Sequence, residues 1–171
     1  IILGVPYSYA IDMWSLGCIL AELISGYPLF PGEDEKDQIA YIMEVLDVPP
    51  KSVLAKGARS HLFFEENGTP IITPNSEGQR RYPNTKTLPE VLENNNPLFI
   101  SFIKKCLHWD PEKRMTPERA LRNEWILDGL PPQILVNHQR LHNIPNSSLP
   151  NNVKRKLERY FSRRSKEDKK S

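Results

Sequence analysis

The longest nearly uninterrupted apolar stretch of this 171-residue chain runs from Ala10 to Ser25 and reads AIDMWSLGCILAELIS. Asp12 and Glu22 are its only charged residues. A surface helix shows one apolar stripe, so a helix that is apolar nearly all round is normally buried on every side. We expect Gly26 to end this helix and Asp12 to lie inside the fold. A buried carboxylate needs hydrogen-bond donors, because an unpaired buried charge is costly.

Other segments outward from this stretch also show helical patterns. Residues 34–46 form an amphipathic pattern with Asp34 as N-cap, and residues 97–108 carry a second apolar face. A third helix is predicted to open at Thr116-Pro117 and to reach Trp125-Ile126. Residues 51–96 lose periodicity and hold one hairpin signal, around Asn67-Gly68. The predicted fold class is therefore mainly α, with an insert at about 48–96 packed on a helical body.

The charge of the chain is unevenly distributed. It carries 23 Lys and Arg against 21 Asp and Glu, yet residues 1–50 are net −7, residues 51–126 net +3 and residues 127–171 net +6. After Gly129 the helical pattern gives way to Pro- and Asn-rich segments and a basic run, in which residues 153–161 could form a short basic amphipathic helix. We expect residues 128–171 to be a linker and a solvated basic tail. Contact of this tail with nucleic acid or acidic membrane is the alternative.

Several classes of function are excluded by the residue inventory. Two cysteines in 171 residues rule out a disulfide scaffold, and no Cys/His spacing resembles a zinc site. No apolar run reaches the roughly 18 residues of a membrane span, and we expect no membrane partner. Cys106 is expected in the core, and no nucleophile-plus-base pattern surrounds any histidine: His61, His108, His138 or His142. We therefore expect no catalytic, cofactor-binding or metal-binding residue. The hydrophobic start at Ile1, without a Met, suggests a piece of a larger protein.

Three motifs nevertheless resemble a known family. The first reads Asp12-Met13-Trp14-Ser15-Leu16-Gly17-Cys18, followed by Glu22-Leu23, and resembles the D-x-W-S-x-G…E-[LM] signature of the helical lobe of eukaryotic protein kinases. The second is the loop Gly26-Tyr27-Pro28-Leu29-Phe30-Pro31-Gly32. The third runs from Cys106-Leu107 through Trp109-Asp110-Pro111 to Arg114-Met115-Thr116 and resembles the last kinase motif, in which an Arg follows D-P.

The insert narrows the resemblance. Together with Ile42-Met43-Glu44-Val45-Leu46 and Arg81-Tyr82-Pro83, it is similar to the dual-specificity tyrosine-regulated kinases (the DYRK family) of the CMGC group. The resemblance covers residues 1–127, a partial kinase domain after the activation segment. Residues 128–171 are not matched.

The resemblance implies a supporting role for three residues. Asp12 would cap backbone amides of the catalytic loop, and Trp14 would pack beside it. Arg114 would pair with the Glu that ends the activation segment, just before Ile1. These side chains would be structural anchors that hold catalytic residues in place.

The chain lacks the parts of a kinase that perform chemistry. The Gly-rich loop, the phosphate-pairing Lys, H-R-D-x-x-x-x-N, D-F-G and A-P-E are absent from the 171 residues. The resemblance implies that the complete protein transfers the γ-phosphate of ATP to Ser or Thr of protein substrates and phosphorylates its own Tyr. ATP and Mg²⁺ would be bound outside this span, so the isolated chain is predicted to be inactive and poorly stable.

The expected partners are protein substrates and the remainder of the kinase domain, with the protein located inside the cell, in cytoplasm, nucleus or both. Two alternatives stay open. One is a pseudokinase or truncated scaffold that binds partners through the insert or the tail. The other is a nucleic-acid-binding tail, which the scarcity of interleaved aromatic residues disfavours.

Overall fold

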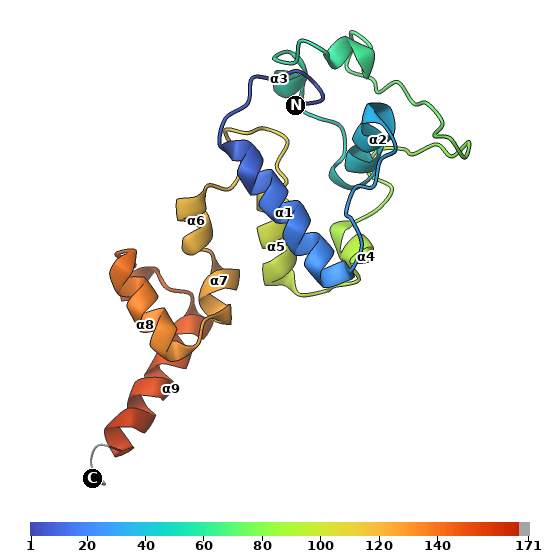
Figure 1. The fold of residues 1–171 in the computed structure, drawn as a ribbon. Helices are drawn as coiled ribbons and strands as arrows, with labels where there is room; N and C mark the ends of the chain where they lie inside the picture. The colour runs from blue at the N-terminus through green and yellow to red at the C-terminus, as the bar shows by residue number, and fades with distance from the viewer. Residues whose placement is uncertain (168–171) are drawn as a thin grey trace. The chain divides into compact units, whose positions relative to one another are not determined.

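The computed structural model describes residues 1–167 and consists of helices joined by long connections (Figure 1). It divides into two compact units, Ile1–Thr116 and the residues from Pro117 onward. Within the described residues the β-structure is a single antiparallel bridge between Phe64 and Pro70. The prediction of a mainly α fold is confirmed. No helix of the described residues is long and apolar enough to cross a membrane.

The first unit is organised around helix α1 (Ala10–Ser25), which packs against α5 (Pro97–Cys106). Gly26 ends α1 in the left-handed conformation at φ 79°, as predicted, and its N–H bonds to the carbonyl of Glu22. The two helices meet closely at Gly17, where an added Cβ would lie 2.8 Å from the Cβ of Cys106. Glycine is thus required at this crossing because any side chain would push the helices apart.

In this chain α1 is buried on one side only, whereas its apolar sequence is typical of a helix buried on every side. Only Met13, Gly17 and Ala21, spaced four residues apart, are buried. The opposite face is open, with Ile19 56% and Leu23 74% exposed. The physical reason is that α4 and α5 are the described helices that pack extensively on α1, and both lie on one side of it.

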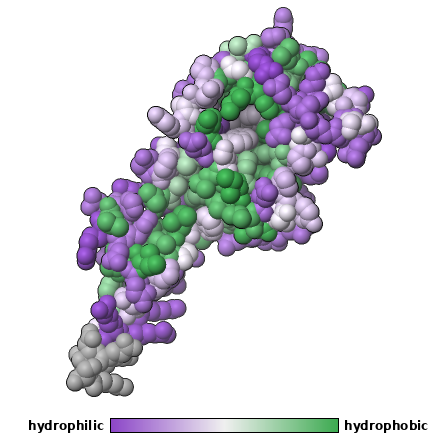
Figure 2. Space-filling view, in the orientation of Figure 1, coloured by the Kyte–Doolittle hydropathy of each residue, from purple (hydrophilic) through white to green (hydrophobic). Residues whose placement is uncertain are grey.

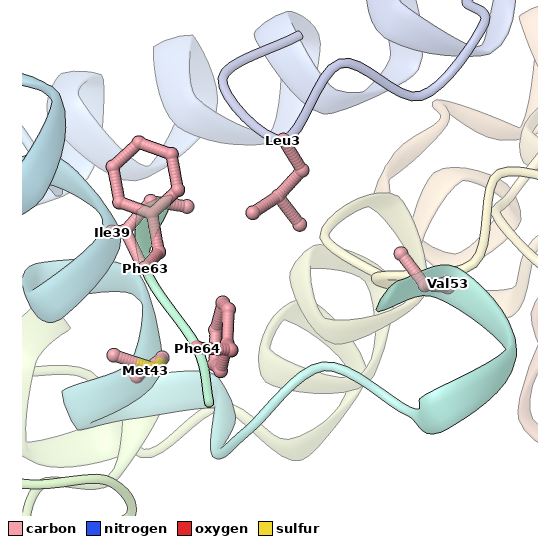
Figure 3. Close-up of a cluster of buried hydrophobic side chains, with 6 residues drawn as sticks. All are labelled: Leu3, Ile39, Met43, Val53, Phe63 and Phe64. Atoms are coloured by element: carbon pink, nitrogen blue, oxygen red, sulfur yellow. The ribbon is translucent and has the colours of Figure 1, made fainter. Parts of the chain in front are cut away.

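Helix α2 (Glu35–Leu46) begins where the sequence predicts, because the Asp34 carboxylate accepts hydrogen bonds from the backbone N–H groups of Lys36 and Asp37. Its apolar face joins a second core around α3 (Lys51–Leu54). Figure 3 shows side chains of this cluster converging from the N-terminal segment, α2, α3 and the segment after the 3₁₀ turn η1 (Ser60–Leu62): Leu3, Ile39, Met43, Val53, Phe63 and Phe64.

The predicted hairpin is present but short, and forms the one bridge that flanks Asn67-Gly68. Gly68 takes φ 91°, which a glycine tolerates. The segment then leads to α4 (Leu88–Leu92), which opens with a capping box between Thr87 and Glu90. The T-x-x-E spacing was a readable helix signal that the periodicity argument overlooked.

A buried ion-pair network attaches this segment to α2. The Arg81 guanidinium lies 3.4 Å from the Asp37 carboxylate, 3.6 Å from Glu44 and 3.5 Å from the centre of the Tyr41 ring. Asp37 and Glu44 are buried, and Lys86 also reaches Glu44, at 3.1 Å. The insert therefore packs on the helical body through charge as well as apolar contact.

The second unit opens with two helices where the sequence predicted one. Helix α6 (Pro117–Leu121) is separated from α7 (Glu124–Gly129) at Asn123. The Asn123 side chain accepts a hydrogen bond from the N–H of Trp125, so it begins a new helix instead of continuing the old one.

The expectation of a linker and solvated tail after residue 127 differs from the structure. Residues in this region form α8 (Pro132–Leu141), the turn η2 (Asn146–Ser148) and α9 (Asn151–Glu167), which is longer than the predicted 153–161. Apolar residues spread along these segments share one core: Leu127, Leu135, Ile144, Leu149, Val153 and Leu157. The end of the basic run, residues 168–171, lies outside the described residues.

Candidate functional site

The three predicted anchor residues lie in the first unit, at or near the N-terminal end of α1. Arg114 is brought there by the tight turn of the D-P motif, in which the N–H groups of Lys113 and Arg114 both bond to the carbonyl of Asp110. The Asp110 carboxylate accepts the N–H of Glu112 at 3.0 Å and completes the turn. The turn of the D-P motif thus directs the Arg114 side chain toward the first turn of α1.

Arg114 is buried, and each of its three guanidinium nitrogens donates a hydrogen bond. Nε donates to the carbonyl of His108 at 2.9 Å, and the two terminal nitrogens donate to Ala10 at 2.9 Å and Trp109 at 3.3 Å. The bond to Ala10 joins residues 104 positions apart and reaches the first turn of α1. Burial lowers the pKa of Arg114 below its usual range, since desolvation disfavours the charged form.

An aromatic cluster frames this arginine. Its guanidinium carbon lies 5.1 Å from the centre of the Trp14 ring, within cation–π range. Trp14 in turn lies 6.0 Å from Trp109 and 6.2 Å from Phe30, ring centre to ring centre. Trp109 donates from Nε1 to the carbonyl of Asp47 at 3.0 Å, which links the motif to the end of α2. Sequence reasoning missed Trp109 as an anchor, although it stands inside the quoted motif.

A largely apolar cavity of about 360 Å³ adjoins Arg114. Its lining includes Ile1, Ile11, Trp14 and Trp109. The α-amino group of Ile1 has a pKa lowered from its usual value, first by burial and then by the positive charges of Arg114 and Arg59. The start of the chain therefore lies within the electrostatic reach of the arginine.

Asp12 occupies a different position from Arg114 and does not lie inside the fold as predicted. Its side chain is exposed, because it projects from the open side of α1. Leu16, Ile19 and Leu23 follow it at helical spacing on the same side, and all three are exposed. Figure 2 shows apolar residues gathered on the exposed surface of this part of the molecule. The carboxylate thus stands at one end of an apolar stripe.

The cysteines and several histidines of the described residues have surroundings that the structure defines. Burial raises the pKa of Cys18 and of Cys106 to about 11, so both are protonated thiols at neutral pH and poor nucleophiles. Cys106 is fully buried, as predicted. His108 accepts the N–H of Asp110 and serves the turn. The rings of His138 and His142 lie 4.5 Å apart, a proximity that the sequence reading did not foresee.

The described residues do not fit ATP–Mg²⁺. No group of three or more His, Cys, Asp or Glu in that part of the chain could hold a metal ion. The cavity beside Arg114 is mostly apolar, and no Gly-rich phosphate loop occurs in the sequence.

Comparison with known proteins agrees with the motifs. The family model of the protein kinase domain matches residues 1–126. Over 126 residues the chain is 51% identical to dual specificity tyrosine-phosphorylation-regulated kinase 4 of Homo sapiens, covering 74% of this chain and 24% of that protein. It is 49% identical to dual specificity tyrosine-phosphorylation-regulated kinase 2 of Drosophila melanogaster, covering 74% and 18%.

A third relative is the DYRK-family kinase pom1 of Schizosaccharomyces pombe, which is 45% identical over 126 residues, covering 74% of this chain and 12% of that protein. The chain thus spans about a quarter or less of the length of these relatives.

Proposed function

This chain belongs to the protein kinase family, and from that premise we propose that it is the helical supporting part of an active dual-specificity kinase. Such an enzyme transfers the γ-phosphate of ATP to Ser or Thr of protein substrates and phosphorylates its own Tyr. The residues described here would hold catalytic groups in position, while sequence outside these 171 residues would supply those groups. The observation that carries the proposal is the Arg114 network.

Arg114 supports this role because its side chain connects separate segments through hydrogen bonds. Three hydrogen bonds from one buried guanidinium fix the first turn of α1 against the D-P motif. Buried charges are tolerated only where such partners exist. In the proposed enzyme a carboxylate that precedes Ile1 would meet Arg114 from the cavity side. Ile1 and Arg114 both line this cavity, which supports this path.

Besides the contact at Arg114, the open side of α1 would provide a second contact, with the catalytic loop. A catalytic loop that covers Leu16, Ile19 and Leu23 would remove apolar surface from water and would bring its backbone N–H groups to the Asp12 carboxylate. The two parts of this surface would contribute differently to binding of the loop. Burial of the apolar side chains would supply affinity, and the Asp12 carboxylate would fix the register of the loop. This arrangement makes Asp12 a positioning residue.

Protein kinases use ATP and Mg²⁺ as phosphate donor and metal, and bind both with Gly-rich, Lys, Asp and Asn elements. The described residues do not fit either group, as shown above. We place no step of phosphoryl transfer on this chain. Its contribution is the rigid platform on which those elements rest.

The experiment that tests the proposal is a chimera. The segment of the Homo sapiens relative that precedes its matched region is joined to residues 1–171, and transfer of labelled phosphate to a general protein substrate is measured. We expect activity from the chimera and none from residues 1–171 alone. An inactive but folded and nucleotide-binding chimera would overturn the proposal and favour a scaffold.

Asp12→Asn tests the positioning role within the same chimera. The amide keeps the size but loses the charge that strengthens hydrogen bonds to backbone N–H groups, so we expect kcat to fall at least about tenfold with the KM for ATP little changed. Glu22→Gln is the matched control, because Glu22 is the other exposed carboxylate of α1. Equal effects of the two substitutions would remove the positioning role.

A further inference from the structure

The outer side of α9 presents a row of arginines in the second unit. Arg155, Arg159 and Arg163 recur at every fourth residue and are exposed. A second row of half-buried side chains runs beside them. The two rows and Pro132 of α8 line an open hollow of about 470 Å³, and we call its α9 residues the arginine face: Asn152, Arg155, Lys156, Arg159, Tyr160 and Arg163.

Contacts on the inner side of α9 hold the helix in the orientation that exposes the arginine face. Val153 and Leu157 are 0% and 6% exposed in the core of the unit. Asn152 donates to the Asp128 carboxylate at 3.0 Å, and the Lys156 ammonium donates to the backbone carbonyl of the same residue. Rotation of the helix would break all of these contacts, so the arginines are held on the surface by the fold.

The charge of the arginine face is not neutralised by the side chains that the structure describes. No carboxylate of residues 1–165 lies in salt-bridge distance of the three guanidinium groups. Arg155 reaches only the carbonyl of Asn151, at 3.4 Å. Like charges one turn apart on a helix repel each other and destabilise it. A bound anion would relieve this repulsion.

The geometry favours phosphate over other anions. A guanidinium presents a planar fork of N–H donors that pairs with phosphate oxygens in bidentate fashion. Residues four apart on a helix are about 6 Å apart along its axis, so neighbouring forks can converge on one phosphate group. We propose that the arginine face binds a phosphorylated segment of a protein through its phosphate groups. The choice of a phosphoprotein rests on the proposed kinase function, which generates such segments.

Two other polyanions fit the surface less well. A membrane-surface helix inserts its apolar side into the lipid, but here Val153 and Leu157 are enclosed in the core. Single-stranded nucleic acid is held by bases that stack on free aromatic rings. Tyr160, the aromatic residue of the arginine face, already has its hydroxyl bonded to Arg164 and its ring centre 5.3 Å from that of Phe161.

Fluorescence polarisation with the full 171-residue chain tests the proposal without ATP or kinase activity. The probe is a short labelled peptide that carries two phosphoserines, and the comparison is the same peptide unphosphorylated, at physiological salt. We expect the phosphorylated peptide to bind at least about tenfold more tightly. The triple change Arg155→Gln, Arg159→Gln and Arg163→Gln should abolish this difference.

Two further variants separate recognition from bulk charge. Lys51→Gln, Lys104→Gln and Lys105→Gln remove the same number of charges from exposed positions elsewhere and should leave binding unchanged. Arg155→Lys, Arg159→Lys and Arg163→Lys keep the charge but lose the forks, and should weaken binding at least about threefold. Circular dichroism checks that every variant keeps its helices.

The proposal is overturned if phosphorylated and unphosphorylated peptides bind alike, or if the lysine variant binds as well as the native chain. It is also overturned if single-stranded RNA, or vesicles of phosphatidylcholine and phosphatidylserine, bind more tightly than the phosphopeptide. Because the assay needs no phosphoryl transfer, an inactive kinase chimera with intact phosphopeptide binding would refute the proposed function alone.

Discussion

Replacing Arg114 by methionine should destabilise the first unit strongly. The substitution keeps an unbranched chain of similar length and removes the three hydrogen bonds to the carbonyls of His108, Ala10 and Trp109. Hydrogen bonds to charged groups contribute roughly 1.5–3 kcal/mol each. Their sum is offset in part, because the variant no longer desolvates a guanidinium. We therefore expect a loss of about 3 kcal/mol in the free energy of unfolding.

The assay is urea unfolding of the 171-residue chain, followed by tryptophan fluorescence. Trp14 and Trp109 report on the surroundings of Arg114. With an m-value of about 2 kcal/mol per molar urea, a loss of this size lowers the unfolding midpoint by about 1.5 M. Arg59→Met is the matched control, because Arg59 pairs with Glu35 at the surface and its side chain is 42% exposed. An exposed pair of this kind contributes little to stability, because water and salt screen it, so the urea midpoint should move far less than in Arg114→Met.

Arg114→Lys completes the design. An ammonium keeps the positive charge but cannot reproduce the planar fork that spans three carbonyls, so most of the stability should still be lost. Full rescue by lysine would show that charge alone matters. Equal losses in Arg114→Met and Arg59→Met would refute the view that this network holds α1 in place. If the native chain unfolds without a cooperative transition, the rate of heat inactivation of the kinase chimera gives the same comparison.

Gly17→Val should lower the free energy of unfolding by about 1–3 kcal/mol through overpacking, since even a Cβ would lie 2.8 Å from that of Cys106. An unchanged urea midpoint would contradict the close approach of α1 and α5. Arg81→Met should cost about 3–5 kcal/mol, because the buried Asp37 would lose its cation, and Asp37→Asn in the same chain should recover part of the loss in a double-mutant cycle. Burial raises the thiol pKa of Cys18 and Cys106 to about 11. The unfolded chain therefore releases these protons first, and stability should fall as pH rises from about 8.5 toward 11; urea midpoints of the double alanine variant should show a smaller fall.

The sequence identified the helices whose ends carry local signals. Gly26 ends α1 and Asp34 begins α2 where expected, because caps act through hydrogen bonds within a few residues. The motifs likewise identified the family and pointed to Trp14 and Arg114. Their contact with each other joins residues 100 positions apart and was not predictable from local pattern.

The second unit shows the opposite case. Its core draws Leu135 from α8, Ile144 and Leu149 from connections, and Val153 from α9. The amphipathic pattern of residues 153–161 is visible in the sequence, but periodicity weighs each segment alone and does not identify the residues that enclose Val153 and Leu157. The pairing of these segments became visible only in the folded chain.

The sequence by itself determined the bounds of α1 and α2, where α5 and α6 begin, the protein kinase membership and the absence of the phosphate-binding and catalytic motifs from these 171 residues. Only the tertiary structure decided which side of α1 is buried, which carbonyls receive Arg114, and that the arginine face points outward. The physical reason is the difference in sequence separation between the interactions involved. Caps, turns and motifs act over a few residues, whereas burial depends on segments that meet only after the whole chain has folded.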